Sequence, residues 1–318
     1  MSEERVVFSV IAPIYNEIES INEFYNRIRL VLEQLQQPWE LILVDDGSVD
    51  GSTERILALA EEDERVLPVI FARNFGHQIA VTAGLDASSG DAVVIIDSDL
   101  QDPPEVIPDL IARWREGYEV VYAVRSEREG ESWFKLITAG LFYRLITRMT
   151  EVDIPLDTGD FRLLDREVVD VMGTMRERYR FLRGMTSWVG FRQAGVSYKR
   201  AARFAGSTKY PFKKMVRLAL NAVTGFSFVP LQMITYGGVI VTVISVLLWL
   251  VDLLLVLGVQ GIPEILQPGL IGLFFLGGVQ LISIGILGEY IGRLYDEARG
   301  RPLYIVRKNK TQIEHNEE

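Results

Sequence analysis

The chain has 318 residues and a formal net charge of −10 at neutral pH, with no cysteine and two histidines, His77 and His315. These features exclude disulfides and thiolate metal sites and make a zinc centre unexpected. Because nucleic-acid binders usually carry a basic face, the acidic balance also argues against a nucleic-acid partner.

The first 125 residues alternate short apolar runs with stretches of helical spacing, a pattern typical of βαβ units and a mainly parallel sheet. Helices are predicted at Ile18–Gln36 and Ser52–Ala60, and another can begin at Pro103. Ligands of open α/β sheets bind at the carboxyl ends of strands, so the polar residues after each run are candidates for a site. The predicted strands are Val6–Pro13, Glu40–Val44, Val66–Phe71, Ala92–Ile96 and Val120–Val124.

Two stretches in the middle of the chain, 133–149 and 211–229, are apolar with scattered lysine and arginine. Both are too charged for a membrane span. We predict helices that lie at the membrane interface, although an ordinary core helix fits the first stretch equally well.

Two later stretches, Gly237–Leu257 and Gly269–Gly288, are long and apolar enough to cross a bilayer. Lysine and arginine are absent between Arg217 and Arg293 and cluster outside both spans. By the positive-inside rule, both termini and the N-terminal domain are predicted to be cytoplasmic, in a two-span protein of the cell (inner) membrane. Asp252 within the first span could be functional, but an interfacial or helix–helix role is at least as well supported.

Asp97-Ser98-Asp99 directly follows the fourth predicted strand. Alternate residues of an extended segment point the same way, so both carboxylates can face one site, and Gln101 could add a further oxygen. Such oxygens suit Mg²⁺ or Mn²⁺, which commonly use one or two carboxylates together with substrate phosphates. Acidic pairs are frequent in turns, so it is the position after a buried strand that favours a metal site at Asp97, Asp99 and Gln101.

Two further polar segments end the first two predicted strands. Asp45 and Asp46 precede Gly47, where they could cap a turn or accept hydrogen bonds from a nucleoside base or ribose. Tyr15 and Glu17 stand where a dinucleotide-binding fold would carry G-x-G-x-x-G, which argues against NAD or FAD. Tyr15 could stack on a base and Glu17 could accept its imino proton, and the same segment could also cap a helix.

The strand-end segments are 12–17 (APIYNE), 44–48 (VDDGS), 73–77 (RNFGH) and 97–104 (DSDLQDPP). Together they resemble the motifs of glycosyltransferase family 2, and more narrowly those of the dolichol-phosphate-mannose-synthase-like polyprenyl-phosphate glycosyltransferases. Residues 288–293 and 301–304 resemble the two-span bacterial members, including those that make lipid-linked glucose for O-antigen modification. The resemblance covers nearly the whole chain.

The resemblance implies an α/β catalytic domain with the GT-A (Rossmann-like) fold, interfacial amphipathic helices and two transmembrane helices. It also suggests a homo-oligomer such as a tetramer. Asp99 and Gln101 would contact the metal, with Asp97 beside them. The residues carried over to the nucleotide-sugar site are Pro13, Tyr15, Glu17, Asp46, Asp97, Ser98 and Arg125.

The same resemblance implies roles for the segment 203–209 and for Asp157, and His77 is judged from its own position. Arg203 and Lys209 would close over the diphosphate as a mobile loop and offset its charge, unless this loop is a basic segment that faces the membrane. Asp157 is the candidate base, but a phosphate monoester is largely ionised at neutral pH, so Asp157 could instead orient the sugar or bind Arg162. For His77 a helix-start or core role is favoured over catalysis.

Four parts are therefore expected: 1–130 as the nucleotide-sugar-binding half, 131–230 as the acceptor-side half, 231–293 as two transmembrane helices, and 294–318 as a cytoplasmic tail. We predict cell-envelope hexosyl transfer, with UDP-glucose as the first-choice donor and an undecaprenyl phosphate-like acceptor.

Four alternatives remain. A GDP-mannose-dependent synthase fits because the same residues could bind either base, and a non-catalytic nucleotide-binding membrane protein would bind without turnover. A processive polysaccharide synthase would carry Q-x-x-R-W, a spacing that Arg183 and Trp188 do not form. A transporter or channel subunit gains little support from two spans.

Overall fold

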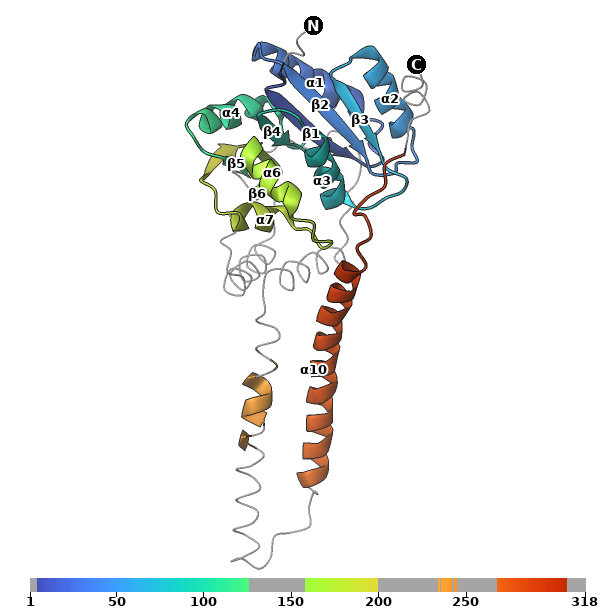
Figure 1. Ribbon diagram of the computed structural model, residues 1–318, viewed down its shortest axis with the longest axis vertical. Coiled ribbons are helices and arrows are strands. Elements are labelled where there is room, and N and C mark those ends of the chain that lie inside the picture. The colour runs from blue at the N-terminus through green and yellow to red at the C-terminus, as the bar shows by residue number, and fades with distance from the viewer. Residues whose placement is uncertain are drawn as a thin grey trace, which may run out of the picture.

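The structure is a computed structural model that describes residues 5–125, 158–199, 234, 236–241, 243, 244 and 268–307 (Figure 1). The predicted interfacial helices at 133–149 and 211–229 lie wholly outside these residues. So do Asp157, Arg203 and Lys209, together with most of the first predicted span and Asp252.

One seven-stranded sheet, in the order β3-β2-β1-β4-β6-β5-β7, forms the centre of the described domain. The five predicted strands are confirmed to within two residues, and the mainly parallel pairing is confirmed for β3, β2, β1 and β4. The sheet is nevertheless mixed, because β6 pairs antiparallel with both β4 and β5. The strands are β1 Phe8–Ile14, β2 Trp39–Asp45, β3 Val66–Ile70, β4 Ala92–Ile95, β5 Val120–Arg125, β6 Thr158–Asp165 and β7 Gln193–Tyr198.

The reversed direction of β6 decides where the site lies. Because β6 runs against its neighbours, its first residues lie at the same edge as the last residues of β4 and β5. The β7 strand runs parallel to β5 and ends at that edge with Tyr198. The ends of β4, β5 and β7 and the start of β6 therefore lie at one edge of the sheet, so residues before and after the segment 126–157 meet there.

Helices cover both faces of the sheet (Figure 1). In β1, Phe8 and Val10 belong to the apolar cluster that includes buried residues of α1, α2 and α4, whereas Ile11 belongs to the cluster with α3, α6 and α7. This alternation is the period-two pattern of a strand buried on both faces. The helices are α1 Ile21–Gln34, α2 Ser52–Glu62, α3 His77–Ala87, the 3₁₀ turn η1 Pro104–Val106, α4 Ile107–Arg115, α6 Arg166–Thr174, α7 Leu182–Trp188 and α10 Pro268–Ala298.

The close packing of α3 on β1 requires a glycine at position 84. A Cβ atom at Gly84 would lie 2.2 Å from Cγ2 of Ile11, whose side chain is fully buried. We expect Gly84→Ala to destabilise the domain by about 1–3 kcal/mol, because overpacking forces the helix away from the sheet. Thermal unfolding of the full chain in detergent measures this effect. Gly173→Ala is the control, since its Cβ would meet nothing within 4 Å; an equal loss in both variants would contradict the packing explanation.

The helix α10 projects from the domain (Figure 1). Within the described part of the chain, it is the one helix that is long and apolar enough to cross a membrane, over Phe275–Ala298, and none of its apolar window is buried inside the protein. The predicted second span, Gly269–Gly288, lies within α10.

The chain returns to the domain after α10. Gly300, at φ +57°, ends the helix in the left-handed conformation that glycine accommodates most readily. Residues 301–307, which we name the C-terminal strap, then run beside β3 (Figure 1). Within the strap, Val306 forms an antiparallel bridge with Phe71.

Candidate active site

The Asp97–Gln101 turn continues β4 at the carboxyl edge of the sheet. Exposure alternates along the turn: Asp97 and Asp99 are partly exposed, whereas Ser98 and Leu100 are buried. Leu100 adopts φ +60°, and an Asp99 carboxylate oxygen accepts a hydrogen bond from the backbone N–H of Gln101 at 3.1 Å. The turn thus presents the two carboxylates toward the same open edge.

Ser98 contacts the backbone of β1. Its side chain is buried and its hydroxyl donates to the carbonyl of Pro13 at 3.2 Å. This bond joins the ends of β1 and β4. In this structure Ser98 and Pro13 therefore fix the floor of the site.

The oxygen-rich turn fits a hard divalent cation. Asp97 and Asp99 supply two carboxylates, and Gln101, which is also partly exposed, can supply an amide oxygen. No group of three histidine, cysteine, aspartate or glutamate side chains arranged to hold a metal occurs among the described residues. A pair of carboxylates is the usual protein contribution when Mg²⁺ is shared with substrate phosphates.

Asp46, at the end of β2, holds the loop that precedes α3. Its buried carboxylate accepts hydrogen bonds from the backbone N–H groups of Phe75 at 2.6 Å and Gly76 at 3.0 Å. Burial raises the pKa of Asp46, and these two N–H groups act in the opposite direction. Gly47 makes the close approach possible, because a Cβ there would lie 2.6 Å from the backbone of Arg73.

Asp45 takes the turn-capping role. Its carboxylate accepts from the backbone N–H of Ser48 at 2.9 Å and from the hydroxyl of Thr53. The neighbouring β1–α1 loop is tied to the same turn, because the backbone N–H of Glu17 donates to the hydroxyl of Ser52 at 3.1 Å. Tyr15 is 41% exposed at the rim of this edge, where stacking on a base remains a prediction.

Asp160 is the centre of a charged cluster that joins three elements. One carboxylate oxygen accepts from Nε2 of His77 at 3.0 Å and from the amide of Gln78 at 2.9 Å, both in the first turn of α3. The other accepts from Nε of Arg183 in α7 at 3.0 Å. We name these four residues the Asp160 cluster. Because the Asp160 side chain is only 10% exposed, we infer that the cluster orders the site from its buried side.

His77 connects the Asp160 cluster to the acidic turn, since its Nε2 also lies 3.7 Å from an Asp97 carboxylate oxygen. Burial alone would lower the pKa of His77, but Asp97 and Asp160 raise it to about 9. Burial raises the pKa of Asp97 to about 6 although His77 opposes that shift. A divalent cation at the turn would favour the ionised form of Asp97.

Arg125 belongs to a second polar group at the same edge. Its Nε donates to the hydroxyl of Tyr198 at 3.3 Å, that hydroxyl donates to the buried carboxylate of Asp102, and Arg125 pairs with Asp102 at 3.8 Å. Arg125, Tyr198 and Asp102 come from β5, β7 and the loop before η1, respectively. The structure thus places Arg125 beside the Asp97–Gln101 turn and links it to that turn through Asp102.

The structure brings together the described residues that were predicted for the site: Pro13, Tyr15, Glu17, Asp46, Asp97, Ser98, Asp99, Gln101 and Arg125. Their roles toward ligands remain predictions. Sequence reasoning missed the roles of Asp160, Gln78, Arg183, Asp102 and Tyr198. The helix-start role of His77 is confirmed, because α3 begins there, but its contacts with Asp97 and Asp160 place it in the site rather than in the apolar core.

Comparison with known proteins gives one family. Residues 9–173 match the model described as glycosyl transferase family 2. A Bacillus subtilis (strain 168) protein described as an uncharacterized glycosyltransferase is 47% identical, over 96% of this chain and 94% of the relative. A Shigella flexneri protein named SfII prophage-derived bactoprenol glucosyl transferase is 45% identical, over 95% and 97%. Among solved structures, the mannosyl-3-phosphoglycerate synthase of Rubrobacter xylanophilus has 16% identity and a TM-score of 0.48, covering 73% of this chain and 75% of its own.

Proposed function

Because the chain belongs to glycosyltransferase family 2, we propose that it catalyses inverting, metal-dependent transfer of a hexose from a nucleotide sugar to a polyprenyl phosphate. The family match and the mixed α/β sheet agree with a GT-A catalytic domain. The Shigella flexneri relative, bactoprenol glucosyl transferase by name, supports both the lipid acceptor and glucose as the sugar. UDP-glucose is accordingly the proposed donor.

The proposal rests on one observation: an acidic turn at the ligand-binding edge of the sheet and a helix suited to a membrane occur in the same chain. Asp97 and Asp99 present their carboxylates at the ligand-binding edge of the sheet, and the same domain is fixed to a helix with the length and composition of a membrane span. A soluble donor and a lipid-linked acceptor need these two features side by side. We place the domain and both termini at the cytoplasmic face of the cell membrane.

The bound cation would offset negative charge on the donor diphosphate, held by Asp99, Gln101 and Asp97. Asp46 would order the loop against which the nucleoside lies, and Arg125 would add positive charge near the phosphates. Arg203 and Lys209 stay in their proposed role as cations that close over the leaving diphosphate.

The chemistry forms one bond and breaks one. A phosphate oxygen of the acceptor attacks the anomeric carbon, the bond from that carbon to the diphosphate oxygen breaks, and the nucleoside diphosphate leaves with the electron pair. The acceptor phosphate is largely ionised at neutral pH, so little proton removal is needed. Asp157 therefore serves in this proposal to orient the sugar or to take a remaining proton, and positioning supplies most of the rate.

The test uses the full-length protein in detergent with undecaprenyl phosphate and a panel of labelled sugar nucleotides. We expect labelled lipid from UDP-glucose, loss of the product with EDTA, and recovery when Mg²⁺ or Mn²⁺ is added in excess. The linkage in the product should have the anomeric configuration opposite to that of the donor. Formation of labelled lipid from GDP-mannose alone would show that GDP-mannose, and not UDP-glucose, is the donor. Nucleotide binding without product from any donor would contradict the enzymatic function.

A further inference from the structure

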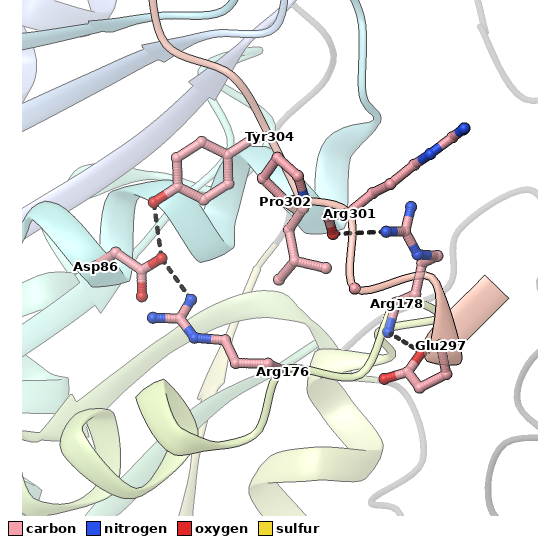
Figure 2. Close-up of a pocket in the computed structure, with 9 residues that line it drawn as sticks. Asp86, Arg176, Arg178, Glu297, Arg301, Pro302 and Tyr304 are labelled. Atoms are coloured by element: carbon pink, nitrogen blue, oxygen red, sulfur yellow. Dashed lines mark hydrogen bonds and ion pairs between the residues drawn. The ribbon is translucent and has the colours of Figure 1, made fainter. Parts of the chain in front are cut away.

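The C-terminal strap connects the membrane helix to the loop that the site uses. Its lower end is held at the end of α10, where the guanidinium of Arg178 donates to the carbonyl of Arg301 at 2.6 Å and the backbone N–H of Arg178 donates to Glu297 at 3.1 Å (Figure 2). Beside them, the hydroxyl of Tyr179 donates to Asp296 of α10 at 2.6 Å. The start of the strap is therefore fixed both to the helix and to the catalytic domain.

The upper end of the strap extends the sheet at β3. The backbone N–H of Ala72 donates to the carbonyl of Ile305 at 2.9 Å, and the backbone N–H of Arg307 donates to the carbonyl of Ile70 at 2.8 Å. These two bonds flank the Phe71–Val306 bridge in the manner of an antiparallel pair. They pair the strap with the last residue of β3, Ile70, and fix the backbone at residue 72, where the loop before α3 begins.

Tyr304 attaches the strap to the domain by its side chain. Its ring stacks on Phe71 with centroids 5.2 Å apart, and its hydroxyl donates to Asp86 of α3 at 2.8 Å (Figure 2). Asp86 also pairs with Arg176, just after α6, at 2.7 Å. The carboxylate that binds Tyr304 is therefore itself held in place by a second segment of the domain. The strap is thereby attached to Phe71, directly before the loop 72–76, and to Asp86 in the last turn of the helix that follows the loop.

Contacts continue from the strap to the proposed nucleoside site. Phe71 packs edge-to-face on Phe75 with centroids 5.5 Å apart, and the backbone N–H groups of Phe75 and Gly76 donate to Asp46. Tyr304, Phe71, Phe75 and Asp46 thus form a contiguous series from the strap to the end of β2. Phe71 is the member that contacts both the strap and the loop, so loss of the Tyr304 ring would remove one of the two aromatic contacts that hold Phe71.

We propose that Tyr304 and the strap are positioning elements of the donor site: they hold the loop 72–76 in the conformation that binds the nucleotide, and they tie that conformation to the membrane helix. The inference rests on the proposed function only in assigning this loop to the donor. The proposal predicts an effect on the donor that is larger than the effect on the acceptor. Loss of the strap contact should weaken nucleotide binding and raise the KM for the donor, with little change in the KM for the lipid acceptor.

The experiment compares three variants of the full-length protein in detergent micelles. Tyr304→Ala removes both the stacking and the hydrogen bond, Tyr304→Phe keeps the stacking, and Val306→Thr changes an exposed side chain while the main-chain pairing stays. UDP binding with Mg²⁺ is measured by calorimetry, the KM for each substrate by labelled-lipid formation, and folding by thermal unfolding.

We expect Tyr304→Ala to weaken UDP binding and raise the donor KM by roughly tenfold, a size typical of mutations that act on a site through intermediate contacts. Tyr304→Phe should recover most of this loss, and Val306→Thr should behave as the wild type. Unchanged UDP binding in a folded Tyr304→Ala protein would overturn the proposal, as would equal rises in both KM values. Wild-type protein that neither binds UDP nor forms lipid product would overturn the proposed function and, with it, this assignment.

Discussion

Replacement of Asp99 by alanine is expected to lower hexose transfer by about two to three orders of magnitude, the loss typical when a group that stabilises developing charge is removed. Asp99 is partly exposed at the open edge of the sheet, and one of its oxygens already accepts from the N–H of Gln101. In Asp99→Ala the cation would have fewer protein ligands, so the charge on the leaving diphosphate would be less well balanced.

The metal titration makes this prediction specific. Transfer by Asp99→Ala should need more Mn²⁺ or Mg²⁺ than the wild type for its residual activity, whereas Asp109→Asn, an exposed carboxylate on α4, should match the wild type at every metal concentration. Full transfer by Asp99→Ala in excess Mg²⁺ would refute the metal assignment at this turn.

Asp160→Asn is expected to lower both stability and turnover. The carboxylate is 10% exposed and faces Arg183 and His77, so its neutralisation removes negative charge from beside two partly buried cationic groups. Removal of one partner from a buried ion pair costs about 3 kcal/mol or more. Turnover should fall further, by roughly 100-fold, because His77 also lies beside Asp97 and a displaced group of the site loses its productive geometry.

The pH dependence has a definite sign. Burial alone would raise the pKa of the Asp160 carboxyl, but Arg183 and His77 hold it well below its ordinary value. A group with a lowered pKa in the folded state stabilises the fold above the carboxyl pKa of the unfolded chain, about 3.9, and loses this contribution as the pH falls. Thermal unfolding at pH 7 should therefore show the full difference between Asp160→Asn and the wild type.

Asp170→Asn serves as the matched control for this substitution. Asp170 forms a surface pair with Arg166 at 3.7 Å and its side chain is 68% exposed, so its loss should cost less than about 1 kcal/mol and leave turnover unchanged. If Asp160→Asn unfolded at the same temperature as this control, the Asp160 cluster could not be a stabilising centre of the site.

The N-terminal half of the fold follows from local patterns. The strand predicted at Glu40–Val44 is a short apolar run followed by aspartate, and the structure has it as β2, Trp39–Asp45. The first four strands were predictable because each is a short apolar run followed by a stretch of helical spacing or a helix-start signal. The same logic located the turn at Asp97. Parallel βαβ order places all these ends together without any knowledge of side-chain contacts.

The remaining site residues could not be located from such patterns. Asp160 lies in β6 and Arg183 in α7, and their approach to His77 depends on the antiparallel insertion of β6 between β4 and β5. Nothing in the local sequence fixes which strands β6 joins, because that choice is made by long-range packing. The acidic segment 157–162 was the available signal, but it did not distinguish a residue that meets substrate from one that binds other side chains.

The reversed strand β6 also bears on how this architecture can diversify. Arg125 at the end of β5 and Thr158 at the start of β6 lie at the same edge of the sheet, so the two residues that border the segment 126–157 are both beside the site. A segment with both junctions at one place can be lengthened, shortened or exchanged between homologues while every strand pairing stays in register. In the predicted division of the chain, in which the acceptor side begins at residue 131, acceptor preference can therefore change without a change in the nucleotide-sugar-binding half.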